Sequence, residues 1–356
     1  MTPQAAASHV LRTGGALALA VAAGFLFATL HTPIPWMLGP LLTVASFRVA
    51  GAPLEAPPGG RQIGQWIIGT SLGLYFTPLV VHEVAGLWWL LVAGAAFAIS
   101  VGYLMGIALS RLAGMDRTTA FFASVPGGAA EMAVLGNRFG ARVDRVAAAQ
   151  SLRIVLVVLI VPAAFIAIDV HGADPYVPGV THFAWLGLGC LMLATLAGSG
   201  VAMLLRLPNA FVLGSLFVAI PLTACEIDWS SIPTPMTNAA QCLLGCTLGA
   251  RFQPDFVRTA HRFVGAVVAT VLLSIVVSAG FGIALAWLAN QHPATLVLGM
   301  APGGIAEMCI TAKVLQLGVP LITAFHVTRV VVLLLVTAPL FSRARKWRQR
   351  TNRSGH

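Results

Sequence analysis

Two stretches of the sequence share one pattern of residues that could do chemistry: a Pro-Gly-Gly break, a Glu three residues later, and an Arg further on. The residues are Pro126, Gly127, Gly128, Glu131 and Arg153 in the first stretch and Pro302, Gly303, Gly304, Glu307 and Arg329 in the second. In both stretches the Glu and the Arg are 22 positions apart. Their surroundings are strongly apolar, where a charge is costly, so they indicate a functional site by default.

The Pro-Gly-Gly break predicts a turn that presents free backbone groups. Proline removes a backbone donor, and glycine permits positive φ and the close approach of other groups. Residues 129–136 are then predicted to form a helix, which puts Glu131 in its first turn, where the helix dipole favours negative charge. The same geometry makes the start of this helix a candidate anion site.

The charged residues of the two motifs have a functional and a structural interpretation. Glu131 and Glu307 could coordinate a coupling cation or carry a proton, while Arg153 and Arg329 could neutralise them or hold an anionic substrate by bidentate contacts. Alternatively, each Glu pairs with an Arg only to lock the broken segment to a helix, at little net gain in stability. The symmetry of the pattern fits both interpretations.

The composition identifies the elements that must position these residues as membrane helices. The chain is 58% hydrophobic and 9% charged, against about 25% charged for ordinary soluble domains, and its mean hydropathy is +0.88. Apolar runs that approach the roughly 20 residues needed to cross a bilayer recur along the chain. We therefore expect an all-α integral membrane protein without a soluble enzyme domain.

The chain divides into two similar halves. A shift of 175 to 176 positions aligns them, so we predict repeats at 1–175 and 176–342, followed by a basic tail at 343–356. The six apolar segments expected in each half are 14–30, 34–50, 62–81, 85–107, 118–137 and 146–168, then 183–205, 209–225, 236–252, 263–289, 294–315 and 319–341.

The charge distribution favours inverted repeats. If all six segments of each half cross, two arginine-rich loops lie outside and the acidic loops lie inside, the reverse of the usual bias. If each Pro-Gly-Gly segment instead re-enters, each half has about five crossings, and the Lys and Arg residues lie inside except Arg153 and Arg329, within helices, and Lys313. The expected location is a bacterial inner (plasma) membrane with both termini cytoplasmic. Two broken segments in inverted repeats predict a site between them near the midplane.

Several further pairs of residues correspond between the halves. Two small-xxx-small pairs, Gly69 with Gly73 and Gly245 with Gly249, predict close helix packing. Gln150 and His326 each precede the motif arginine by one turn. The histidine is either a proton-sensitive group at one gate or a packing residue.

The basic tail and the cysteines have simple interpretations. Most of the net charge of +10 lies in short loops and in the tail. This distribution fits contact with anionic membrane lipid, and we expect no nucleic-acid partner.

The five cysteines form no CxxC pair, so neither disulfides nor zinc is indicated. We expect neither a metal nor a cofactor.

The motifs resemble those of the membrane AbrB family, duplicated Gram-negative proteins often labelled ammonia monooxygenase or regulator of the aidB gene. The resemblance covers nearly the whole chain. Its marks are Pro-Trp-Met-Leu-Gly at 35–39, the two PGG-x-A-E-M blocks, and the downstream Arg153 and Arg329. It implies a duplicated architecture similar to that of transporters. A copper or iron monooxygenase needs clustered ligands, whereas the nine histidines here are scattered, so we expect no enzyme.

The sequence therefore predicts a secondary transporter or exporter of a small, anionic solute, with H⁺ or Na⁺ as coupling ion and a site between the two PGG-x-A-E-M segments. The alternative is a membrane sensor or regulator that affects gene expression. Either interpretation allows a homo-oligomer.

Overall fold

The computed structural model describes residues 3–32, 34–170, 172, 176, 178–252, 261–333 and 335–336, and these residues form helices and no strands. The predicted all-α class is confirmed. The basic tail at 343–356 lies outside the described residues. The helices are α1 (Pro3–Thr29), α2 (Pro35–Val49), α3 (Gly60–Gly73), α4 (Pro78–Gly86), α5 (Trp88–Ala113), α6 (Arg117–Ser124), α7 (Ala129–Arg138), α8 (Val143–Ala167), α9 (Trp185–Leu204), α10 (Ala210–Ala224), α11 (Thr234–Gly249), α13 (His261–Ala289), α14 (Pro293–Met300), α15 (Ile305–Val314) and a final helix, Val319–Leu333.

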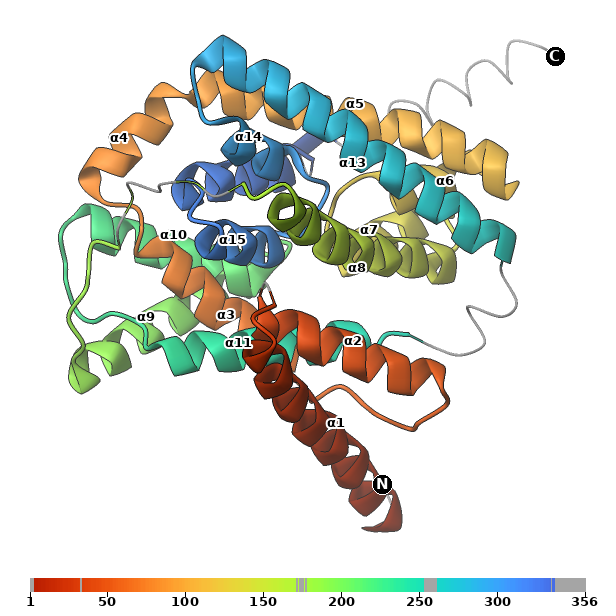
Figure 1. Ribbon diagram of the computed structural model, residues 1–356, viewed down its shortest axis with the longest axis horizontal. Coiled ribbons are helices and arrows are strands. Elements are labelled where there is room, and N and C mark those ends of the chain that lie inside the picture. The colour runs from red at the N-terminus through yellow and green to blue at the C-terminus, as the bar shows by residue number, and fades with distance from the viewer. Residues whose placement is uncertain are drawn as a thin grey trace.

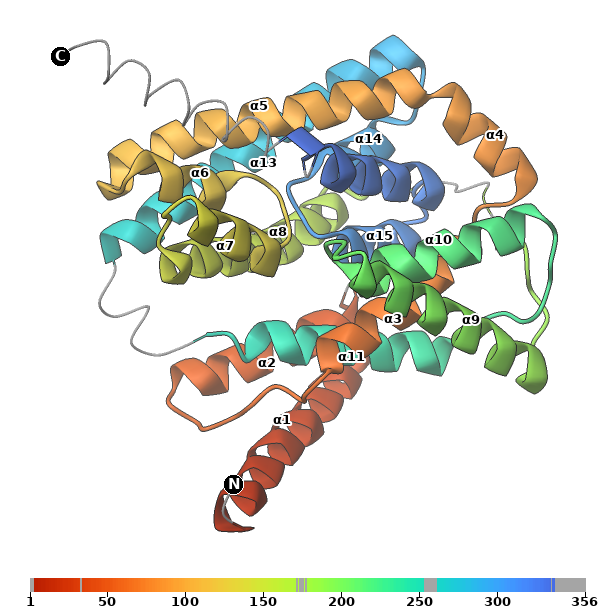
Figure 2. The same cartoon turned by 180° about the vertical axis from the view of Figure 1, so that it is seen from behind.

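Five of these helices are long and apolar enough to cross a bilayer by themselves. They are α1 from Ser8 onward, α5, α8, α9 and α13. In Figures 1 and 2, α5 and α13 lie together along one side of the molecule, the group containing α2, α3 and α9 to α11 lies on the other, and the broken segments lie between. Several apolar helices of this length make the chain a multi-pass membrane protein in character.

Helices of the first half pack on helices of the second half. Helix α2 packs on α11, and the corresponding helices α10 and α3 pack on each other. A Cβ added at Gly73 would overlap Ala219 of α10, and one added at Gly249 would lie 2.7 Å from the Leu41 carbonyl oxygen of α2. Gly69 and Gly245 make similarly close contacts one turn earlier, so all four glycines lie where backbones of different halves approach.

The apolar segment expected at 62–81 is divided between two helices. Helix α3 ends at Gly73, and α4 starts at Pro78 with its axis turned by 92°. The Thr77 hydroxyl caps α4 by accepting from the Val80 amide at 3.4 Å, and proline suits the first helical position because that position needs no N–H. The Thr-Pro sequence at 77–78 therefore starts a new helix and interrupts an otherwise continuous apolar run.

Each Pro-Gly-Gly segment forms a helical hairpin. Helices α6 and α7 pack on each other and on α8, and the Arg142 amide, just beyond α7, donates to the Thr119 hydroxyl near the start of α6 at 2.9 Å. The second hairpin, α14 and α15, closes at the corresponding positions, because a Cβ on Gly318 would lie 3.1 Å from Thr295 Cγ2. Both segments thus return to the end from which they start.

The open ends of the two hairpins lie at opposite ends of α8. The α6–α7 hairpin opens near the start of α8, where Arg262 Nε of α13 donates to the Leu112 carbonyl of α5 at 2.9 Å. The α14–α15 hairpin opens near the other end, where the Gly172 amide donates to the Leu315 carbonyl at 3.0 Å. Figure 1 shows the two hairpins on opposite sides of the central region.

Candidate functional site

The tips of the two hairpins meet. Two cavities of about 30 Å³ each lie beside them, enough for about two water molecules apiece. Pro126, Arg153 and Arg329 line both cavities. The first is completed mainly by α5 and α13, with the hydroxyls of Ser124, Thr270, Ser274 and Ser278. The second contains Arg61, Gln65, Asn209, Glu307 and the glycines of both turns.

The motif arginines bind the turns rather than the glutamates. Arg153 donates from Nη1 to the Val125 carbonyl at 3.0 Å and from Nη2 to the Gly127 carbonyl at 3.3 Å. Helix α6 ends at Ser124, and Pro126 has no N–H, so few backbone donors remain for these carbonyls. The Gly127 amide donates to the Val125 carbonyl at 2.8 Å, and Arg153 adds a further donor there and supplies one to the Gly127 carbonyl.

The second arginine repeats this arrangement. Arg329 Nη1 donates to the Ala301 carbonyl at 2.8 Å, and Nη2 donates to the Gly303 carbonyl at 2.6 Å. The ion pairs found within the described residues join neither motif arginine to a motif glutamate. The broken segments are therefore held to α8 and to the final helix by bonds between arginine and backbone, and not by Glu–Arg pairs.

The glutamates instead fold back over the last glycine of each turn. Gly128 is the N-cap of α7 and Gly304 that of α15, and a Cβ on either would overlap the Oε2 atom of the glutamate three residues later. Glu131 Oε1 accepts from the Asn209 amide at 3.0 Å, which joins the first hairpin to the second half. Each carboxylate thus lies in the first turn of a helix, where the dipole favours it.

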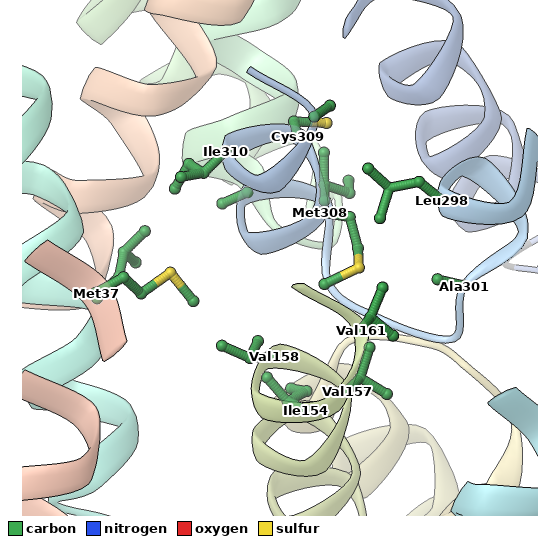
Figure 3. Close-up of a cluster of buried hydrophobic side chains, with 14 of the residues drawn as sticks. Met37, Ile154, Val157, Val158, Val161, Leu298, Ala301, Met308, Cys309 and Ile310 are labelled. Carbon is green, nitrogen blue, oxygen red and sulfur yellow. The ribbon is translucent and has the colours of Figure 1, made fainter. Parts of the chain in front are cut away.

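The methionine of each motif packs under its turn. Met132 is 1% exposed and Met308 is fully buried. A Cβ on Gly127 would lie 2.7 Å from Met132 atoms, and one on Gly303 would lie 2.6 Å from Met308 Cγ. In Figure 3, Met308 lies with Val157 and other buried apolar side chains of α8. This packing requires the second residue of each turn to be glycine.

Charged atoms at the tips retain hydrogen-bonding capacity. Arg153 and Arg329 are each 4% exposed. Within the described residues, their Nε atoms and Glu131 Oε2 are buried and have no hydrogen-bond partner. The charge of Arg153 is also repelled by the charge of Arg329 and attracted by that of Glu307. Buried polar atoms in native proteins nearly always have a partner, so these atoms favour a ligand or water at the cavities.

Gln150 and His326 support the first arm of each hairpin. Gln150 Nε2 donates to the carbonyls of Phe122 and Val125, both at 2.8 Å, and His326 Nε2 lies 3.2 Å from the Leu298 carbonyl. A carbonyl only accepts, so we infer that the proton is on Nε2. This contact supports the interpretation of His326 as a packing residue. A role of His326 in proton sensing stays a prediction.

Three polar residues of the second cavity were not predicted from the sequence. Arg61 and Gln65 belong to α3, and Asn209 is the N-cap of α10 with φ 45°. Gln65 Nε2 donates to Asn209 Oδ1 at 3.5 Å. The Leu-Pro-Asn sequence before α10 was an available signal, because asparagine tolerates left-handed backbone at turns.

Comparisons with known proteins show the family of the chain. The family model described as transition state regulatory protein AbrB matches residues 36–345. The chain is 27% identical to the uncharacterized protein YhjN of Bacillus subtilis (strain 168), over 91% of this chain and 91% of that protein. It is 25% identical to a protein of Escherichia coli (strain K12) with the provisional name regulator AbrB, over 92% and 94% of the two chains. The family resemblance drawn from the motifs is confirmed, and the chain belongs to the AbrB family.

Proposed function

We propose that this chain is a secondary transporter of a small anionic solute, whose binding site is the pair of cavities between the two Pro-Gly-Gly turns. The observation that carries the proposal is the meeting of two broken helical hairpins, which open at opposite ends of α8 and share Pro126, Arg153 and Arg329 at their tips. Broken segments in corresponding places of two halves are typical of substrate sites in secondary transporters.

The charges around the second cavity favour an anion. Among the residues that line it, Arg61, Arg153 and Arg329 contribute three guanidinium groups, against the single carboxylate of Glu307. The starts of α7 and α15 add partial positive charge. The unpartnered Nε atoms of Arg153 and Arg329 are suitable donors, since an arginine that binds its turn through Nη1 and Nη2 can bind a solute oxygen through Nε.

The glutamates suit a coupling role. Glu131 Oε2 is buried and has no hydrogen-bond partner in the part of the chain that the structure describes, and such a carboxylate can accept a proton or contribute to a Na⁺ site. Protonation of Glu131 would leave the surrounding positive charge less compensated and strengthen anion binding. H⁺ or Na⁺ would then travel with the solute.

The charged ends of the hairpins suggest the orientation. Arg142, Arg145 and Arg262 lie at the open end of the α6–α7 hairpin, so we place that end in the cytoplasm of a bacterium, by the positive-inside rule. The open end of the α14–α15 hairpin then faces outward. The two halves become inverted repeats, and both termini are cytoplasmic.

A membrane regulator is the second candidate, favoured by the names of the family and of the Escherichia coli relative. A sensor of this kind would bind a solute without moving it. Regulation of gene expression could equally result from transport that changes the concentration of a metabolite.

Purified protein in proteoliposomes tests the proposal. A melting-temperature screen of small carboxylates and inorganic anions identifies a ligand first, because a ligand of the folded state raises the melting temperature. The labelled ligand is then used for uptake under an imposed H⁺ or Na⁺ gradient. We expect uptake that Glu131→Gln abolishes and that Arg138→Gln, an exposed control, preserves. Binding without uptake would favour the sensor, and absence of any ligand would contradict both functions.

A further inference from the structure

A much larger cavity, separate from the hairpin tips, lies between α8, α13 and α14. Its volume is about 580 Å³, within the range of small-molecule sites. Its lining is apolar along most of its length, with side chains such as Ile160, Phe165 and Ile283. Helices α8 and α13 are both candidate membrane spans, so this cavity lies at the depth of the hydrocarbon.

The cavity is elongated along the helices. On α8 the lining extends from Ile160 to Phe165 and continues past the end of the helix to Val170. On α13 it extends from Ile275 to Ile283, which corresponds to about 12 Å at 1.5 Å per residue. Ile283 is 43% exposed and Ile168 is 68% exposed, so the cavity opens sideways toward the bilayer. This is the shape of a flexible hydrocarbon chain rather than of a compact solute.

The polar residues of the lining gather at one end. Asp169, which follows α8, and His292, the N-cap of α14, lie near the open end of the α14–α15 hairpin. The other end of the lining includes Ala301, whose carbonyl accepts from Arg329. The arrangement matches an amphiphile with its head at the membrane surface and its tail directed toward the second Pro-Gly-Gly turn.

The first half has larger, aromatic side chains at two of the corresponding positions. A shift of 176 positions places Tyr103 on Ala279 and Phe121 on Val297. The rings of Tyr103 and Phe121 are in edge contact, with centroids 6.4 Å apart, whereas Ala279 and Val297 line the cavity. The same shift relates the close approach of Gly106 to Phe121 and of Gly282 to Val297, so the correspondence is structural as well as sequential.

We propose that this cavity is a binding site for one acyl chain of a bilayer phospholipid, with the headgroup at the Asp169 and His292 end. The lipid would contact Ala301 and so support the turn that Arg329 holds. This inference does not depend on transport, because it rests on a cavity that the proposed solute site does not use.

The test uses the full-length protein in vesicles of phosphatidylethanolamine and phosphatidylglycerol that contain a phospholipid with a diazirine near the end of one acyl chain. After irradiation, mass spectrometry locates the attached lipid. We expect attachment on the lining residues of α8, α13 and α14. The double variant Ala279→Tyr, Val297→Phe rebuilds the aromatic pair of the first half and should lower that labelling about tenfold, equivalent to about 1.4 kcal/mol.

Val276→Phe is the matched control, since Val276 lies on α13 with 67% of its surface exposed and does not line the cavity. It should leave the labelling unchanged. If the double variant loses its melting transition, the single variant Val297→Phe gives the same test with less added volume. Unchanged labelling in a folded filled variant would overturn the proposal, as would chain-to-chain crosslinks at these positions, which would identify a second copy as the occupant.

Discussion

Arg329 Nη2 lies 2.6 Å from the carbonyl oxygen of Gly303, so the arginine of the second motif is bonded to its own Pro-Gly-Gly turn. Arg153 repeats this contact with Gly127 at 3.3 Å. A break in a membrane helix leaves backbone carbonyls without donors, and in hydrocarbon water cannot supply them. The two arginines therefore supply donors to the breaks themselves, and their Nε–H groups, which have no hydrogen-bond partner within the described residues, are available to a ligand.

Replacing Arg329 by lysine should destabilise the protein. A single ammonium group cannot span two carbonyls as the planar guanidinium does, and each lost hydrogen bond to a charged group costs about 1.5 to 3 kcal/mol. Arg153→Lys should cost less, because its bonds are longer. Melting temperatures in detergent test this order, with the exposed Arg138→Lys as control. Equal melting temperatures for all three variants would contradict it.

Gly128→Ala should be destabilising in a way that depends on Glu131. The added Cβ would overlap the Oε2 atom of Glu131, so the carboxylate must leave the start of α7. In the double variant Gly128→Ala, Glu131→Ala the overlap disappears, and residues in contact commonly show coupling of about 0.5 to 3 kcal/mol. Melting of the single and double variants measures this coupling. Additive losses would show that the glycine is needed for another reason.

The sequence allowed the broken segments to be predicted because proline and glycine act locally. The helix predicted at 129–136 is observed as α7, Ala129–Arg138, and the four packing glycines lie at close helix contacts. The partner of each arginine could not be predicted in this way. A spacing of 22 residues allows the guanidinium to reach either the glutamate or the turn, and only the folded geometry decides between them.

Residues from the rest of the chain were missed for a related reason. Arg61, Gln65 and Asn209 reach the second cavity because α3 of the first half packs on α10 of the second. This packing brings together residues that are more than 140 positions apart, such as Gln65 and Asn209. Repeat alignment shows which residues correspond, but it does not show which helices of the two halves are in contact.

Gly73→Ala tests the packing of helices between the halves. The new Cβ would overlap the Cβ of Ala219, and overpacking a tight contact typically costs about 1 to 3 kcal/mol. Adding Ala219→Gly should restore much of the stability, because it removes the overlapping atom. Gly86→Ala, where a Cβ meets nothing within 4 Å, is the control. Failure of Ala219→Gly to rescue would place the strain elsewhere.

Acid should weaken the attachment of α1 to the loop after α2. Arg12 donates to Glu55 at 3.0 Å, and His9 also contacts this carboxylate, so Arg12 first and His9 second lower the pKa of Glu55 from 4.5. A lowered folded-state pKa gives stability that is present above 4.5 and is lost as the pH falls through the folded value. The melting temperature of the wild type should therefore exceed that of Glu55→Gln at pH 7 and converge with it as the pH falls below 4.5. A constant difference would contradict this assignment.

The opposite orientation of the hairpins can be tested at Asn137 and Lys313, which correspond in the two halves and are both exposed. Each is replaced by cysteine in a variant without the five natural cysteines, and a membrane-impermeant maleimide is applied to right-side-out and inside-out vesicles. Asn137 lies at the end of α7 and Lys313 at the end of α15, so each marks the open end of its hairpin. We expect Asn137→Cys to react only in inside-out vesicles and Lys313→Cys only in right-side-out vesicles. Reaction of both from one side would show that the hairpins enter from the same face, and the halves could not then be inverted.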